Sequence, residues 1–181
     1  ALPFESQPTR KKIAEAEIQR LEHHSDVCVR LSLERLARQA RDRGKEWSMG
    51  SEWVEDLIDG LVRTLLSMGL INLDLMDLRA IVQHQGRSTM LVGTGHHNQL
   101  SELYDATIKA PLAPMNVAGA KGCLLQIEGG MGMTIGQVDE IATALTSAVD
   151  SDAQVILGAR VSPDLEGVIR IVMLLSGIDE D

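Results

Sequence analysis

The segment from residue 51 to residue 67 constrains the fold most, because it carries more apolar side chains than an ordinary surface helix. Two neighbouring rows of apolar residues repeat at every fourth position: Trp53, Leu57, Leu61 and Leu65, beside Val54, Ile58, Val62 and Leu66. Together the rows form a face wider than a helix needs to cover one side of a core. The pattern predicts a central helix, assigned to residues 47–68, that packs on more than one side.

The residues after the central helix predict an α/β domain, assigned to residues 69–178, with residues 179–181 as a tail. Gly69 is a residue type that commonly ends a helix. Helical and period-2 patterns then alternate, predicting helices at 75–84, 99–109 and 135–149 and strands at 87–93, 121–128, 154–161 and 168–176. This order is typical of one mixed four-stranded sheet with helices packed against it.

Residues 1–46 predict only part of a domain. Their patterns indicate a helix at 9–23, a strand at 27–33 and a short charged helix at 34–43. A lone strand cannot satisfy its backbone hydrogen-bonding groups without neighbouring strands. We therefore interpret residues 1–46 as the second half of a domain whose first half lies outside this chain.

The composition of the chain narrows the classes of function. A net charge of −9 argues against general nucleic-acid binding, which needs clustered Lys and Arg. The two cysteines lack metal-ligand spacing, and the adjacent His96 and His97 are interpreted as part of a solvated loop rather than a metal site. No apolar run is long enough to span a bilayer and no signal peptide is visible, so we expect a cytoplasmic protein.

Three polar residues at the end of the central helix carry the most informative pattern. Asn72, Asp74 and Asp77 lie in the run that joins this helix to the next one. On spacing alone, Asp74 is placed to cap the following helix and Asp77 to favour the positive end of its dipole. Two carboxylates and an amide on one loop are also suited to orienting a water molecule for attack on a phosphoryl group. The spacing leaves both interpretations open.

The same run resembles the synergy loop of the FtsZ family of tubulin-like GTPases, whose pattern is Asn-x-Asp-x-x-Asp. Further segments resemble the family in the same order along the chain: Pro3-Phe4, Met90–Gly95, Ala120–Gly130, Asp152–Gly158 and the run that begins at Arg170. The resemblance covers nearly the whole chain. It implies the C-terminal part of an FtsZ-type protein, with central helix, synergy loop, C-terminal domain and a remnant of the nucleotide-binding domain at residues 1–46.

The resemblance implies a cytoskeletal GTPase of cell division that polymerises head to tail. In that family, one subunit holds GTP or GDP, and the loop of the next subunit supplies the catalytic acids. Asp74 and Asp77 would then position the attacking water, and Asn72 would fix the loop near the phosphates. Carboxylates beside a triphosphate repel it, so Mg²⁺ is implied on the nucleotide of the partner subunit.

The resemblance also assigns residues to the nucleotide in the intact protein. Trp47 falls where the family stacks an aromatic side chain on the base, and Glu52 falls at the acid that pairs with the guanine N1–H and amino group. Arg10 is kept from the family's ribose-binding segment. Two positions depart from the pattern: Leu33 replaces the family's Asn, and Ser6 falls at its ribose-binding Glu. These departures leave open a divergent paralogue that does not turn over GTP.

The family's phosphate loop, Gly-Gly-Gly-Thr-Gly-x-Gly, does not occur in this chain. The glycine-rich run from Gly129 to Gly136 lacks phosphate-loop spacing and is interpreted as a strand-to-helix turn. We therefore expect no tight GTP binding and no hydrolysis by the chain alone. The resemblance implies self-association into filaments and membrane-tethering partners that bind a tail beyond Asp181, without direct membrane insertion. The alternative is a non-catalytic module that binds a filament end and caps it.

Overall fold

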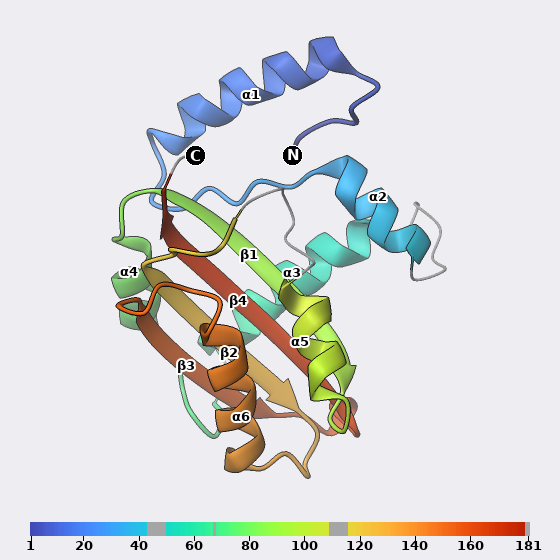
Figure 1. The fold of residues 1–181 in the computed structure, drawn as a ribbon, viewed down its shortest axis with the longest axis vertical. Helices are drawn as coiled ribbons and strands as arrows, with labels where there is room; N and C mark the ends of the chain where they lie inside the picture. The colour runs from blue at the N-terminus through green and yellow to red at the C-terminus, as the bar shows by residue number, and fades with distance from the viewer. Residues whose placement is uncertain (43–49, 67, 109–115, 180–181) are drawn as a thin grey trace.

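The computed structural model describes residues 1–42, 50–66, 68–108 and 116–179 (Figure 1). Within these ranges the side chains of residues 39, 40, 42, 50–54, 56, 57 and 64 are not described. None of the helices in the described residues combines the length and the apolar character that a membrane crossing requires.

A four-stranded mixed sheet forms the centre of the molecule. Its strands are β1 (Arg87–His96), β2 (Gly122–Gly129), β3 (Gln154–Val161) and β4 (Val168–Ile178), in the spatial order β1-β4-β2-β3. Strand β4 runs antiparallel to both β1 and β2, whereas β2 and β3 are parallel. This is the mixed four-stranded sheet that the sequence predicts.

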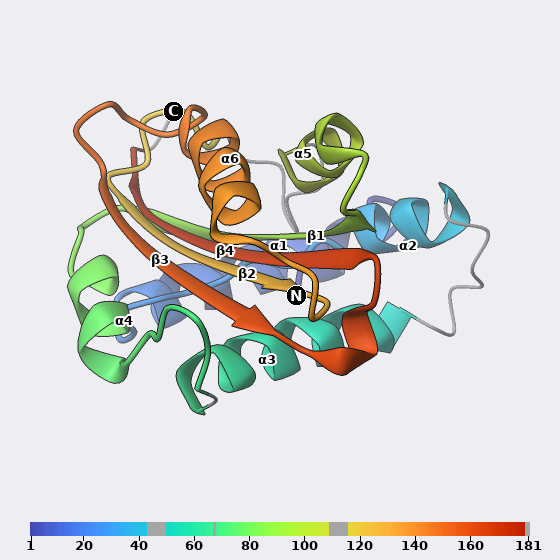
Figure 2. The ribbon, with the colours of Figure 1, turned by 90° about the horizontal axis from the view of Figure 1, so that it is seen from below.

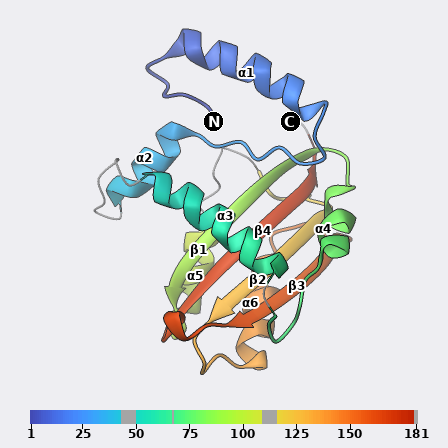
Figure 3. The same ribbon diagram turned by 180° about the vertical axis from the view of Figure 1, so that it is seen from behind.

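Helices cover both faces of the sheet (Figure 2). One face carries α5 (Leu100–Ile108) and α6 (Ile135–Thr146), and the other carries α3 (Gly50–Leu66) and α4 (Leu75–Val82). Figure 3 shows α3 crossing the sheet obliquely, over β4 and toward β2 and β3. Thr134 and Gln137 form a capping box at the start of α6, so the glycine-rich run before it is a strand-to-helix turn, as predicted.

Alternate residues along the strands point to opposite faces of the sheet and contribute to two separate apolar cores, one on each face. The core under α5 and α6 includes the fully buried Leu125 and Ile127 of β2 and Ile171 of β4. The core on the α3 and α4 side includes Leu124 of β2 and Val172 of β4, which point the opposite way. A strand buried on both faces is typical of a central position in a sheet with two helical layers.

The N-terminal segment corrects one prediction. The expected strand at 27–33 is wrong: the described residues there make only isolated bridges, from Val29 to Ser88 and from Ser32 to Leu2, and Leu33 already begins α2 (Leu33–Asp42). The physical reason is that a ladder needs pairing over several residues, whereas this segment has one bridge to β1 at Val29 and one to Leu2 at Ser32. Helix α1 (Pro8–Glu22) likewise buries only Ile18.

Candidate functional site

The loop between α3 and α4, residues 68–74, brings the three predicted catalytic residues together. Asn72 is exposed, and its side-chain oxygen accepts a hydrogen bond from the backbone N–H of Gly69 at 2.7 Å. This bond closes a tight turn immediately after α3. The amide of Asn72 therefore fixes the shape of the loop that leads to the two aspartates.

Asp74 and Asp77 form a reciprocal capping box at the start of α4. Asp74 Oδ1 accepts hydrogen bonds from the backbone N–H groups of Met76 at 2.7 Å and Asp77 at 3.0 Å. Asp77 Oδ2 accepts one from the backbone N–H of Asp74 at 2.9 Å. The predicted capping arrangement is confirmed, and it satisfies backbone donors that helix geometry leaves without partners. Each carboxylate uses one oxygen in these bonds, and all three donors are backbone N–H groups.

Contacts with strand β3 hold the α3–α4 loop in place. Ile71 and Ala159 exchange two backbone hydrogen bonds, of 3.0 and 2.9 Å. A side-chain carbon added at Gly69 would collide with the carbonyl of Ala159, so the close approach requires glycine there. Leu73 is buried, and it packs where a side chain on Gly158 would otherwise stand. Three successive loop contacts therefore fix the aspartates relative to the sheet.

The aspartates face outward, at the surface of the molecule. Asp74 is exposed and Asp77 is half-buried, while Leu70, Leu75 and Met76 beside them are exposed apolar side chains. Acidic groups surrounded by exposed apolar side chains are suited to contact with another macromolecule rather than to a closed pocket. Each carboxylate keeps one oxygen outside the capping box, and a carboxylate oxygen can accept a hydrogen bond from water.

Of the three residues assigned to the nucleotide, only Arg10 has a described side chain. Trp47 lies outside the described residues, and Glu52 lies in α3 with its side chain not described. Arg10 is exposed on α1, which lies at the other end of the molecule from the α3–α4 loop (Figure 3). Their assignment to the base and the ribose stays a prediction.

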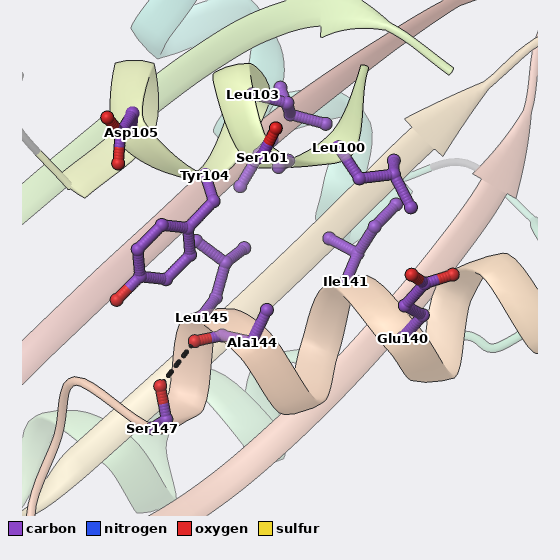
Figure 4. A pocket seen from close by; sticks show the side chains of 11 residues that line it. Leu100, Ser101, Leu103, Tyr104, Asp105, Glu140, Ile141, Ala144, Leu145 and Ser147 are labelled. Atoms are coloured by element: carbon purple, nitrogen blue, oxygen red, sulfur yellow. Dashed lines mark hydrogen bonds between the residues drawn. The ribbon is translucent and has the colours of Figure 1, made fainter. Parts of the chain in front are cut away.

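Two other features of the described chain are separate from the aspartates. A groove of about 340 Å³ lies between α5 and α6, with an apolar lining and with Asp105 and Glu140 among its residues (Figure 4). It is on the opposite face of the sheet from α3 and α4 (Figure 2). His96 and His97 are both exposed, and no group of three metal-binding side chains occurs among the described residues.

Sequence reasoning missed a buried ionic group on the face of the sheet that α3 covers. Glu128 of β2 bonds to Arg160 of β3 and lies near Arg170 of β4. A sequence signal was present, because Glu128 is the only acid in its strand and each arginine is the only charge in the interior of its strand. The pairing itself depends on strand register, which the sequence did not provide.

Comparison with known proteins gives a consistent family. The profile of the FtsZ family, C-terminal domain, matches residues 86–179. The cell division protein FtsZ of Caulobacter vibrioides is 32% identical over 175 residues, which cover 94% of this chain and 34% of that protein. Cell division protein FtsZ 2 of Halobacterium salinarum is 30% identical over 97% of this chain and 46% of its own length.

A solved structure agrees with these sequence matches. The FtsZ dimer of M. jannaschii superposes with a TM-score of 0.84 at 25% identity, covering 97% of this chain and 52% of that one. The chain thus spans between a third and about half of the relatives named here. Its fold, its family profile and its sequence matches agree, and the chain belongs to the FtsZ family.

Proposed function

We propose that this chain is the C-terminal part of a cell-division GTPase, and that its α3–α4 loop acts on GTP bound to a neighbouring subunit. The observation that carries the proposal is the loop itself: Asp74 and Asp77 are rigidly held, outward-facing and free of side-chain partners among the described hydrogen bonds. The relatives named above are cell division proteins. One structural relative is described as a dimer.

The proposal gives two neighbouring subunits different roles in GTP hydrolysis. By the resemblance to FtsZ, the triphosphate and its Mg²⁺ would be held by the nucleotide-binding half of the adjacent subunit. A cation bound there would offset the negative charge of the phosphates. Asp77 and Asp74 would each use the carboxylate oxygen not engaged in the capping box to accept a hydrogen bond from the attacking water. Asn72 holds the turn at Gly69, and the capping box holds the two aspartates relative to each other.

The exposed apolar side of α3 supports the proposal that a further domain packs against this helix. Gly60 packs against Val172 of β4, so one side of the helix is buried on the sheet. On the other side Ile58, Val62 and Leu66 are 56%, 45% and 80% exposed. Such a row of aliphatic side chains gains stability when covered, by about 1.5–3 kcal/mol for each side chain fully buried. A nucleotide-binding half outside this chain would cover it.

The proposed function is tested by GTP turnover of the chain alone and within the longer protein. We expect no turnover by the 181-residue chain, because it lacks a phosphate loop. We expect turnover by the longer protein to fall by at least about a hundredfold when Asp77 becomes Asn, a change that keeps a capping acceptor but removes the charge. Steady turnover by the chain alone that Asp77→Ala abolishes would refute the proposal.

A second candidate function is capping of filament ends. The exposed Leu70, Leu75 and Met76 beside the aspartates are apolar side chains that a docked subunit would cover. Added below stoichiometry to an intact, polymerising subunit, it would then occupy filament ends and reduce the pelletable polymer. Unchanged pelleting would argue against capping and leave the first candidate in place.

A further inference from the structure

One rung of the sheet joins three charged side chains on the face that α3 covers. Glu128 of β2 is paired in register with Arg160 of β3 on one side and with Arg170 of β4 on the other. Glu128 is only 1% exposed, and its Oε1 accepts hydrogen bonds from Arg160 Nη2 at 2.7 Å and Nε at 3.0 Å. Arg170 Nη1 lies 3.9 Å from Glu128 Oε2, which accepts no hydrogen bond from the described residues.

The neighbouring rung carries the contacts of both α3 and the loop. It consists of Gly158, Gln126 and Val172, two residues before or after the charged side chains on each strand. Leu73 of the loop packs over Gly158, and Gly60 of α3 packs over Val172. Because side chains two positions apart point to the same face, the charged rung lies beside these contacts and on their face of the sheet.

The backbone of β3 at Arg160 directly touches the loop. Gly69 approaches both the Ala159 carbonyl and the Cα atom of Arg160, and Ile71 is bonded to Ala159 on both of its backbone groups. A shift of the Arg160 backbone therefore moves the bonding partner of Ile71. If the Arg160 side chain left Glu128, the buried carboxylate would have no hydrogen-bond donor among the described residues, which is costly.

The last turn of α3 is also within the electrostatic reach of this rung. The pKa of Arg63 is raised chiefly by its hydrogen bond to Asp59, with a smaller contribution from the negative charge of Glu128.

We propose that Glu128, held between Arg160 and Arg170, is a positioning residue that sets the location of the α3–α4 loop and of its aspartates. Apolar contacts such as Leu73 on Gly158 resist separation but tolerate sliding, whereas charge-assisted hydrogen bonds are directional. A buried ionic group of this kind is best attested as a device that fixes one register among several. The catalytic consequence of this positioning rests on the proposed function, but the positioning itself does not.

Hydrogen exchange separates the two claims. Glu128→Gln keeps the shape of the side chain and removes its charge, and we expect the Ile71 and Asp77 amides to exchange about tenfold faster, relative to the Leu174 amide in the core. Glu22→Gln is the matched control, because Glu22 receives two hydrogen bonds of 2.7 Å from Arg30 far from the loop. Arg160→Lys keeps the charge but loses the pair of donors, and it serves if Glu128→Gln does not fold.

The outcomes distinguish failure of the positioning from failure of the proposed function. Faster loop exchange, together with a fall in kcat of the longer protein and an unchanged KM for GTP, supports both, since the nucleotide is held by the other subunit. Faster exchange with unchanged kcat keeps the positioning and overturns the proposed use of the loop. Loop exchange that follows the core amide in Glu128→Gln, or that rises equally in Glu22→Gln, overturns the positioning.

Discussion

Substitutions at Asp74 separate the structural role of this residue, as a helix cap, from its proposed chemical role. Its Oδ1 accepts two backbone hydrogen bonds at the start of α4. Asp74→Ala removes both and costs about 1 kcal/mol, the usual price of losing an N-cap. For a chain of this size that corresponds to a fall in Tm of roughly 2–4 °C. Asp74→Asn keeps a side-chain oxygen in the same place and should lose only a few tenths of a kcal/mol, since Asn is as good a cap as Asp.

The two variants should nevertheless be equally poor catalysts. An amide oxygen carries no net charge and cannot take a proton, so both changes remove a water-orienting carboxylate, an effect of about 10²-fold or more in kcat. The assay pairs thermal unfolding of the 181-residue chain with GTP turnover of the longer protein carrying the same change. Turnover that follows the Tm, with Asp74→Asn close to wild type and Asp74→Ala impaired, would refute the reasoning and reduce Asp74 to a helix cap.

Three further predictions concern the support of the loop and the core. Gly69→Ala should cost about 1–3 kcal/mol in urea unfolding, because the added carbon meets the Ala159 carbonyl, while Gly132→Ala, which meets nothing nearby, is the control; equal effects would contradict the close approach. Arg160→Met should cost about 3–5 kcal/mol and Arg170→Met clearly less, since among the described residues Arg160 alone donates hydrogen bonds to Glu128, and the reverse order would contradict the assigned partners. Burial raises the pKa of the Cys123 thiol to about 12, so at pH 8 it should react with a disulfide reagent only on unfolding, whereas the half-buried Cys28 reacts first; rapid labelling of a Cys28→Ser variant would contradict this.

Local patterns were sufficient to predict most of the fold. The helix and strand periods located β3 at 154–161 as found, and the predicted cap at Asp74 is present with both of its hydrogen bonds. These features depend on neighbouring residues, so the information is local. The segment at 27–33 was predicted wrongly because its alternation is also local, whereas a strand exists only when a neighbour completes the ladder.

The support of the candidate site could not be predicted in the same way. Glu128 and Arg160 are 32 residues apart, and their contact depends on the register between β2 and β3. The approach of Gly69 to Ala159 likewise depends on how the loop returns over the edge of the sheet. The sequence resemblance identified Asn72, Asp74 and Asp77, whose chemical roles remain a prediction. Their cap was predicted from the spacing, whereas the contacts of the loop with β3 are visible only in the structure.

The central claim is that the loop of one molecule acts on GTP held by another, and mixing two incomplete molecules tests it most directly. One is a full-length FtsZ subunit in which the aspartate equivalent to Asp77 is replaced by Asn, so that it binds GTP without hydrolysing it. The other is the 181-residue chain, which has an intact loop and no phosphate loop. We expect turnover only in the mixture, and none when the added chain itself carries Asp77→Asn. A mixture that remains inactive although the two molecules bind each other would contradict it.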